Sequence, residues 1–471
     1  PLSTDGADAT TRRQKFIIEN RYHRLTFRLY SKIALSKIRH TEWEELSYPK
    51  NYFLFYRFSA VGFSTLQIFK IQCGAYGPYS YVCWLWRRWP TSVTTRKSKP
   101  LCILMTNSDQ FLTESDRATL LDSLVRYLET KFPRNEIERR DREHIPPYDA
   151  LPIYGELGLL HFAAPNTDGY RDFDWRMVLD IQMLLAGHAY FLGSIYNRIV
   201  SFSVLPIAIN GDAQQRATFL PRLLRGECFF GLALTEPEAG TSLKRLQTQL
   251  CSKDGHLYLT GLKHWISDAT GASHLVVICK DPESGEAGQV SAIVVPVDSV
   301  GISTIPMSKI GNNCMPSFQV QFENVRIDPS WVLGRRGDGM SVLASTLRYS
   351  RASLAATCLG STVAILEYTK QYINERLIGR RRLSEFQIHR HQMVDFFTRA
   401  HQLTLLLKEI AGQINDSRVV GKSMPIDTSS SMAKVLGTEL LQEVANYCMQ
   451  IHASNGYEAS SLIARIWRDS R

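Results

Sequence analysis

The apolar residues of this chain change their spacing twice, and this change restricts the fold more than any other feature. From about residue 107 the spacing is helical, with Thr113 where a helix-capping residue is expected, and further helical stretches cover residues 173–199 and 212–225. Short apolar runs typical of strands follow at residues 229–234, 256–260, 274–278, 290–297 and 318–322. Asp254 and Gly255, between two of these runs, favour a tight hairpin. Helical spacing returns over residues 338–377, 384–416 and 428–453.

This order predicts a mainly α fold with an inserted small β domain. We divide the chain into a basic, aromatic-rich extension over residues 1–106, an N-terminal helical domain over 107–226, a middle β domain over 227–330 and a C-terminal helical domain over 331–471. The last domain is expected to be incomplete at its end. The extension is unassigned, because its Arg-rich start at residues 11–15 fits a transit peptide, a poorly ordered arm or an incorrectly translated extension.

The charge distribution argues against a nucleic-acid or membrane-binding role for the body of the chain. The net charge is +10, but residues 1–100 carry 17 Lys and Arg against 6 Asp and Glu, a charge of +11. The other 371 residues carry 38 against 39, a charge of −1, so the basic excess belongs to the extension. The apolar stretch at residues 52–69 is interrupted by Arg57, so no membrane span is predicted.

The nine cysteines form no CxxC pair, so the sequence predicts neither a metal site nor a disulfide framework. Reduced thiols are typical of the cytoplasm or the mitochondrial matrix, and we expect one of these compartments.

Two short motifs carry the chemistry of the middle domain. Residues 234–241 read Leu-Thr-Glu-Pro-Glu-Ala-Gly-Thr after a strand-like run, and residues 261–267 read Gly-Leu-Lys-His-Trp-Ile-Ser. Together they resemble the flavin-binding middle domain of acyl-CoA dehydrogenases, and the resemblance covers residues 107–471 in the family's domain order. That family has an N-terminal helical domain, a β-barrel-like middle domain and a C-terminal four-helix domain.

The resemblance implies bound FAD, with four residues at its ring. The backbone of Leu234 and Thr235 would meet the edge of the isoalloxazine, Trp265 would pack near the ring, and Ser267 would hydrogen-bond near the reactive nitrogen. The alternative is that Trp265 is a core aromatic residue and Ser267 a turn residue.

Two further elements resemble the family's contacts to the rest of FAD. Arg376, followed by Ile378 in place of the usual Phe, and Gln387 resemble the family's RxxFG…FQ element, in which Arg reaches the pyrophosphate of a neighbouring subunit. The alternative is a solvated basic face, because residues 380–382 are all Arg.

The second of these elements covers residues 450–456 and resembles the family's QxxGGxG turn. It implies cofactor contacts from Gln450, Asn455 and Gly456, although Ala453 and Ser454 replace the glycine pair.

No catalytic base can be assigned from the sequence. Arg351 matches the Arg that follows the catalytic Glu in one subfamily, but Ser350 stands where that Glu would be, and a hydroxyl is not a carboxylate base. In most relatives the Glu follows an RDxR-like element, which is present as residues 468–471, so we expect the base beyond Arg471. Thr241, Ser350 and Arg351 remain the candidate substrate contacts, and Glu236 is expected to be structural.

The function implied is an FAD-dependent oxidoreductase that desaturates an acyl thioester at its α and β carbons, with hydride transfer to flavin. Its expected partners are an acyl-CoA or acyl-carrier-protein thioester, an electron-transfer flavoprotein or oxygen as acceptor, and further copies of the chain. Two alternatives stay open: a flavin monooxygenase of the same fold, which needs no α-proton base, and a non-catalytic flavin-binding relative.

Overall fold

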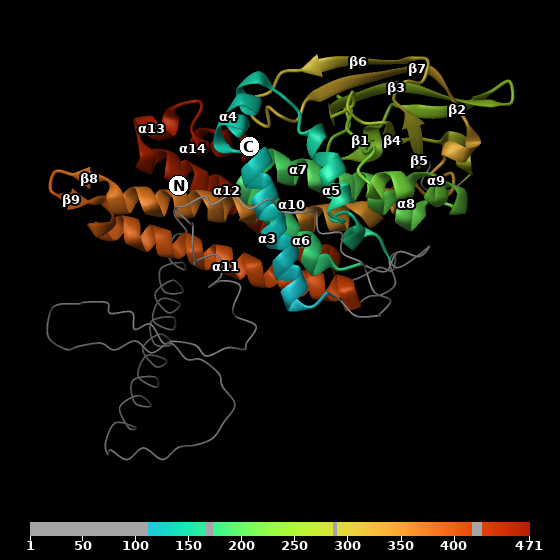
Figure 1. Cartoon of the computed structure of the whole chain (residues 1–471). Helices are drawn as coiled ribbons and strands as arrows, with labels where there is room; N and C mark the ends of the chain where they lie inside the picture. The colour runs from blue at the N-terminus through green and yellow to red at the C-terminus, as the bar shows by residue number, and fades with distance from the viewer. Residues whose placement is uncertain (1–111, 166–172, 286–289, 417–425) are drawn as a thin grey trace, which may run out of the picture. The chain divides into compact units, whose positions relative to one another are not determined.

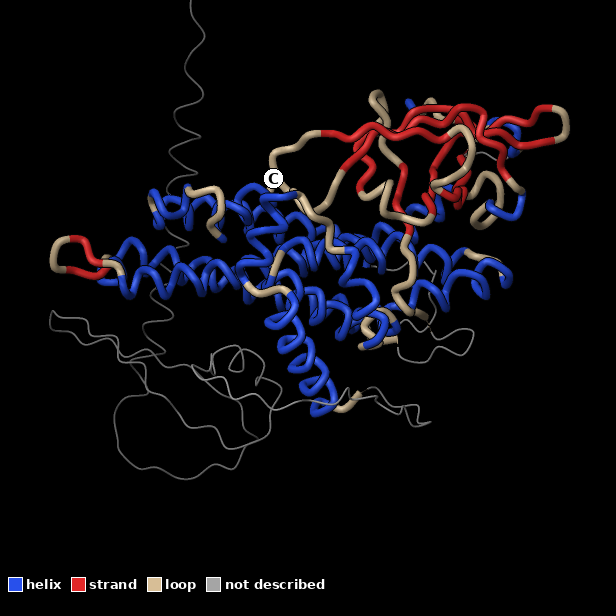
Figure 2. Tube along the Cα trace, turned by 45° about the horizontal axis from the view of Figure 1, so that its top comes forward, coloured by secondary structure: helices blue, strands red, loops and turns tan. Residues whose placement is uncertain are grey.

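The computed structural model describes residues 112–165, 173–285, 290–416 and 426–471 (Figure 1). All of them lie in one unit, Ile103–Arg471, and the extension predicted over residues 1–106 lies outside the described residues. Within this unit the predicted fold class is confirmed, since helical segments precede and follow a single large β-sheet (Figure 2).

Seven α-helices come before the sheet in the described chain. Thr113 caps the first of them as predicted, because its Oγ1 accepts a hydrogen bond from the Asp116 N–H at 3.2 Å. The helix predicted over residues 173–199 is broken at Ala189, whose extended backbone (φ −154°, ψ 131°) separates two helices. The seven are α3 (Glu114–Lys131), α4 (Arg134–Glu143), α5 (Leu151–Glu156), α6 (Trp175–His188), α7 (Tyr190–Ile199), α8 (Leu205–Asn210) and α9 (Ala213–Leu224).

The large sheet has seven strands in the described chain, ordered β1-β4-β2-β3-β7-β6, with β5 paired to β4. Each predicted run overlaps a strand, and Asp254 (φ 52°) and Gly255 (φ 76°) turn the hairpin between β2 and β3. Strands β2 and β6 were not predicted. Most of their side chains are exposed, so neither strand carries a continuous apolar run. The strands are β1 (Phe230–Ala233), β2 (Gln249–Lys253), β3 (His256–Ser267), β4 (His274–Lys280), β5 (Val290–Pro296), β6 (Ile302–Met307) and β7 (Ser317–Ile327).

One long helix organises the C-terminal region. Helix α10 packs against α6, α11 and α12, and its first residue, Gly339, lies against the backbone of Ser291 in β5. Its last residue leads into a two-stranded hairpin at the opposite end from the sheet (Figures 1 and 2). The elements are α10 (Gly339–Glu375), β8 (Leu377–Ile378), β9 (Arg381–Arg382), α11 (Gln387–Asp416), α12 (Ile426–His452), α13 (Ser454–Tyr457) and α14 (Leu462–Asp469).

One stretch of the described chain, Tyr190–Asn210, is long and apolar enough to cross a membrane. However, 78% of that window is buried within the protein. The stretch therefore packs as a core element of the helical region.

Helices α6 and α12 each approach α10 closely through small residues. A Cβ on Gly360 of α10 would lie 2.1 Å from the carbonyl oxygen of Met183 in α6, and a Cβ on Gly437 of α12 would lie 3.2 Å from the backbone of Ala355. Packing this tight leaves no room for a methyl group at Gly360, since a backbone carbonyl cannot move as a flexible side chain can.

We therefore expect the substitution Gly360→Ala to destabilise the protein by about 1–3 kcal/mol through overpacking, in spite of alanine's better helix propensity. Gly412→Ala on α11 is the matched control, because nothing lies within 4 Å of the position of its Cβ. That change should stabilise the protein by up to about 1 kcal/mol. Denaturant unfolding of both variants measures the difference, and equal effects would contradict the packing argument.

Candidate functional site

A fully buried ion pair fixes the loop that holds the first predicted motif. The Nζ of Lys263, on β3, donates to Glu236 Oε1 at 2.8 Å and to the carbonyls of Leu234 at 2.9 Å and Ile278 at 2.6 Å. The side chains of Lys263 and Glu236 are 0% and 1% exposed. One ammonium group thus ties the motif loop to β3 and β4.

The carboxylate of Glu236 holds the other side of this loop. It also accepts hydrogen bonds from the backbone N–H groups of Gln247 and Thr248. Burial opposes its ionisation, but the hydrogen bonds from Lys263 and the two amides outweigh burial and keep the pKa of Glu236 below its ordinary value. With every contact directed into the protein, Glu236 has the structural environment that the sequence suggested.

This framework brings the four predicted ring contacts to the same part of the sheet. The His264 N–H donates to the Thr235 carbonyl at 2.8 Å, so the motif loop lies directly beside β3. At a bulge in β3 the left-handed backbone of Trp265 (φ 59°) leaves its side chain 49% exposed. The hydroxyls of Thr235 and Ser267 are partly exposed and have no hydrogen-bond partner within the described chain. The half-exposed indole of Trp265, with the His264 ring edge-on to it at a centroid distance of 5.8 Å, thus lies two residues from Ser267 on β3 and next to the residue that pairs with Thr235. Thr241 follows in the exposed part of the loop.

The other predicted cofactor contacts lie near the far end of α10. Arg376 is the exposed residue directly after this helix, and Gln387 is the exposed first residue of α11. Gln450 and Asn455 are also exposed, whereas Gly456 is buried. Their turn is held to α10 by His452, whose Nε2 lies 3.1 Å from Thr369 Oγ1.

Two aromatic rings fix the same turn. His452 stacks on Tyr368 and Tyr372 of α10, at centroid distances of 5.2 and 4.1 Å. Burial lowers the pKa of His452 to about 4, so the ring stays neutral between them. The next residue, Ala453, has φ 50° and ψ −131°, a backbone conformation that glycine adopts without strain and alanine does not.

Helix α10 separates the two groups of predicted residues. Its 37 residues span about 55 Å at 1.5 Å per residue, with the sheet against its first residue and Arg376 after its last. Ser350 and Arg351 lie between, in the first half of the helix; Ser350 is 9% exposed, and Arg351 Nη1 donates to Ser431 Oγ at 3.3 Å. A single copy of the chain therefore does not bring Trp265 and Arg376 together.

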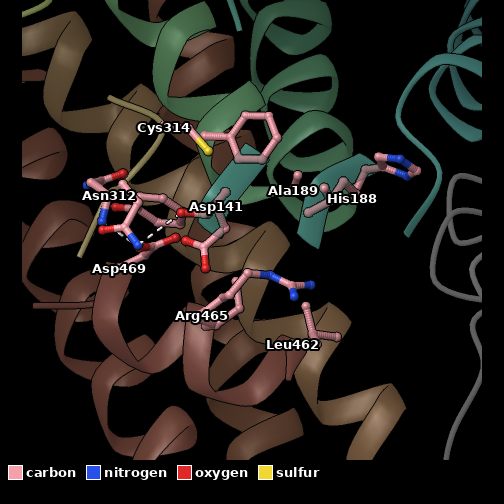
Figure 3. Close-up of a pocket in the computed structure, with 13 residues that line it drawn as sticks. Asp141, His188, Ala189, Asn312, Cys314, Leu462, Arg465 and Asp469 are labelled. Atoms are coloured by element: carbon pink, nitrogen blue, oxygen red, sulfur yellow. Dashed lines mark hydrogen bonds between the residues drawn. The ribbon is translucent and has the colours of Figure 1, made fainter. Parts of the chain in front are cut away.

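The RDxR-like element has a clear structural role. Asp469 accepts a hydrogen bond from the Asn312 N–H at 2.6 Å, and Arg468 forms an ion pair with Asp141 of α4. Burial raises the pKa of Asp469 to about 6. A cavity of about 20 Å³, the size of one water molecule, lies beside these residues and is also lined by Cys314 and Arg465 (Figure 3). None of the predicted flavin or substrate contacts lines it.

Sequence reasoning missed the charged residues that support the ring contacts. Lys263 lies within a predicted motif, but no local signal showed that it pairs with Glu236, 27 residues earlier. Asp268, directly after Ser267, is fully buried and pairs with Arg198 of α7, 70 residues earlier. For either pair, the only sequence signal of a buried ion pair was a charged residue within or next to a motif.

Comparisons with known proteins match the three regions separately. Models of the acyl-CoA dehydrogenase N-terminal, middle and C-terminal domains match residues 114–227, 231–325 and 337–471. A glutaryl-CoA dehydrogenase of Desulfococcus multivorans is 26% identical over 333 residues, which are 70% of this chain and 84% of the relative. A mitochondrial isovaleryl-CoA dehydrogenase of Arabidopsis thaliana is 26% identical over 78% of this chain and 90% of the relative.

The fold is similar to that of solved structures. A glutaryl-coenzyme A dehydrogenase in complex with glutaryl-CoA superposes with a TM-score of 0.69 at 25% identity. The match covers 77% of this chain and 91% of that structure.

The substitution Lys263→Met should destabilise the protein by about 3–5 kcal/mol, because it leaves the Glu236 carboxylate buried without its cation. The double substitution Lys263→Met with Glu236→Gln should recover part of this loss, since the amide removes the unpaired charge. Urea unfolding at neutral pH gives the free energy of each variant. A double variant as unstable as the sum of the two single variants would show that the two residues are not coupled.

Proposed function

Because the chain belongs to the acyl-CoA dehydrogenase family, we propose that it desaturates an acyl thioester at its α and β carbons and passes hydride to flavin. Membership makes the chain an oxidoreductase that uses FAD. We also propose the mitochondrial matrix or the cytoplasm as its compartment, and the mitochondrial name of the plant relative supports the former.

The residues at the sheet fit the ring of FAD. A flavin needs an apolar wall and hydrogen-bonding groups at its polar edge. Trp265 supplies a half-exposed indole, and Thr235 and Ser267 supply hydroxyls without other partners in the described chain. A Cβ on Gly240 would meet nothing within 4 Å, so the motif loop is open to solvent at this position. We propose that Leu234, Thr235, Trp265 and Ser267 hold the ring.

The residues at the far end of α10 fit the diphosphate and adenosine of FAD. Arg376 is exposed and carries the planar guanidinium that binds two phosphate oxygens at once. Gln387, Gln450 and Asn455 expose amides that can donate or accept, and Gly456 completes their turn. We propose that these residues hold the FAD whose ring is bound by another copy of the chain.

A second copy is also supported by the apolar surface of the C-terminal helices. Met432, Val435 and Leu436 are 57%, 47% and 50% exposed on neighbouring turns of α12. Apolar side chains grouped in this way are typical of a protein–protein contact. The length of α10 makes this contact necessary in the proposal, because Trp265 and Arg376 of one chain cannot reach one FAD.

The proposed reaction removes a proton from the carbon next to the thioester carbonyl and a hydride from the following carbon. Bound FAD supplies the acceptor for that hydride. Ser350 cannot take the proton near neutral pH, so the proposed reaction requires a carboxylate base at another position. Thr241, Ser350 and Arg351 are proposed to contact the thioester, carried on CoA or an acyl-carrier protein. Electrons then pass to an electron-transfer flavoprotein or to oxygen.

The observation that carries the proposal is the half-exposed Trp265 beside the free hydroxyls of Thr235 and Ser267. Full-length protein loaded with FAD and mixed without oxygen with a panel of saturated acyl-CoA thioesters should lose its visible flavin absorbance and form enoyl-CoA. Trp265→Glu, a change at an exposed side chain, should abolish FAD binding and leave the fold intact. Flavin-loaded protein that no thioester reduces would contradict the proposal. Oxygen consumption with a hydroxylated product would favour a monooxygenase, and protein that takes up no FAD a non-catalytic relative.

Sharing of each FAD between two chains predicts complementation. Neither the Trp265→Glu chain nor the Arg376→Glu chain should bind FAD alone, because each lacks one half of every site. Co-expressed with different tags, they should assemble into mixed oligomers in which a site that joins intact Trp265 of one chain to intact Arg376 of the other has both halves; a mixed dimer has one such site of its two. The flavin-to-protein ratio of the doubly tagged fraction measures this recovery. No recovery in mixed oligomers would place both halves in one chain.

A further inference from the structure

A buried carboxylate directly follows the last predicted ring contact. Asp268 is 0% exposed, and its side chain forms an ion pair with the guanidinium of Arg198 on α7. The hydroxyl of Tyr148 donates to the same carboxylate at 3.0 Å. Both partners belong to the helical region before the sheet, so this carboxylate links that region to the end of β3.

The backbone of Asp268 is fixed as firmly as its side chain. Its N–H donates to the Pro316 carbonyl at 2.8 Å, and its own carbonyl accepts from Gly271 at 3.0 Å and Ala272 at 2.9 Å. Its φ of 57° lies in the left-handed region, which Asp and Asn adopt more readily than other side chains. The residue type therefore suits both the turn and the ion pair.

Tyr148 is also held without freedom to move. A Cβ on Gly271 would lie 2.2 Å from the Tyr148 ring, so the ring packs directly on the backbone of the turn after β3. The Tyr148 ring also packs against Phe229, at a centroid distance of 5.4 Å. A displacement of Tyr148 or Arg198 would therefore be transmitted to Asp268, and through one peptide bond to Ser267.

We propose that Asp268, Arg198 and Tyr148 form a positioning cluster that sets the place of the Ser267 hydroxyl against the flavin. The cluster joins the N-terminal helices to the strand end that carries this hydroxyl, so flavin binding depends on their correct docking. None of the three residues is assigned to touch the cofactor. The inference rests on the proposed function, because it assumes that Ser267 faces the flavin.

Geometry explains why an ion pair suits this role. A hydrogen bond to the reactive edge of a flavin requires its donor to be placed within a few tenths of an ångström. A buried carboxylate held by one charged and one neutral donor has a single low-energy position, since losing Arg198 leaves the charge unpaired and losing Tyr148 leaves a buried oxygen without its hydrogen bond. An apolar contact at the same place would also stabilise the packing of the N-terminal helices against the end of β3. It would, however, tolerate small shifts in the position of Ser267.

The substitution Asp268→Asn tests the cluster. Asparagine keeps the left-handed turn and can still accept from Tyr148, but it removes the charge that holds Arg198. We expect the Kd for FAD to rise by about tenfold or more and the visible spectrum of bound flavin to shift, because its hydrogen-bonding environment changes.

A matched control separates positioning from stability alone. Asp174 is also a buried carboxylate, paired with Arg117 at 3.3 Å and bound by Asn415 at 2.8 Å, and it contacts none of the predicted ring residues. Asp174→Asn should lower the melting temperature yet leave the Kd for FAD and the flavin spectrum as in the unmodified protein. If both variants lose stability and neither changes flavin binding or the spectrum, the cluster is structural only and the inference fails.

Two further measurements keep the test decisive. If Asp268→Asn does not fold, Arg198→Lys keeps the charge with a poorer fit, and it should change the flavin spectrum in the same direction by a smaller amount. The double variant Arg198→Gln with Asp268→Asn should bind FAD more tightly than Asp268→Asn alone, because no charge is left unpaired; weaker binding would overturn the cluster. Unmodified protein that binds no FAD would instead refute the proposed function.

Discussion

The buried pair of Lys263 and Glu236 is the interaction on which the candidate site depends. The sheet can present a cofactor surface only if the loop after β1 stays beside β3, and this loop has few apolar side chains of its own. One ammonium group and one carboxylate supply the missing attachment, with five hydrogen bonds to three segments of the chain. Both charges are buried, so an arrangement that buries one of them without the other costs more free energy than an arrangement that buries neither. The loop therefore has one stable position. The Thr235 backbone is held beside His264, the neighbour of Trp265, within that constraint.

Helix α10 imposes the second constraint, which is one of distance. A straight element of about 55 Å between the sheet and Arg376 means that any ligand touching both must touch two chains. In the proposed function, oligomerisation is therefore part of the binding site and not a separate property. The exposed Met432 and Leu436 on α12 provide a reason for copies to associate.

The sequence predicted those parts of the fold that local patterns encode. The spacing of apolar residues predicted most ends of α10 and α12 to within two residues of the observed ends. Asp254-Gly255 predicted a hairpin because its turn demands a left-handed backbone. Strand β6 was not predicted because its exposed side chains follow no apolar pattern. The pair of Arg198 and Asp268 was not predicted for a different reason. The two residues are 70 positions apart in the sequence, and each alone looks like an ordinary surface charge. Pairing of distant charges is set by tertiary structure.

The two main departures from the family's motifs, at Ala453 and Ser350, have different consequences. At Ala453 the residue differs from the family's glycine, yet φ 50° and ψ −131° show that the backbone has kept the glycine shape. The stacking of His452 between Tyr368 and Tyr372 supplies contacts that can hold this conformation against a cost of about 1–3 kcal/mol. The backbone shape of this turn, which we propose to bind the cofactor, is therefore preserved by its surroundings. At Ser350 no surrounding contact can compensate in the same way, because packing can restore a shape but cannot give a hydroxyl the proton affinity of a carboxylate.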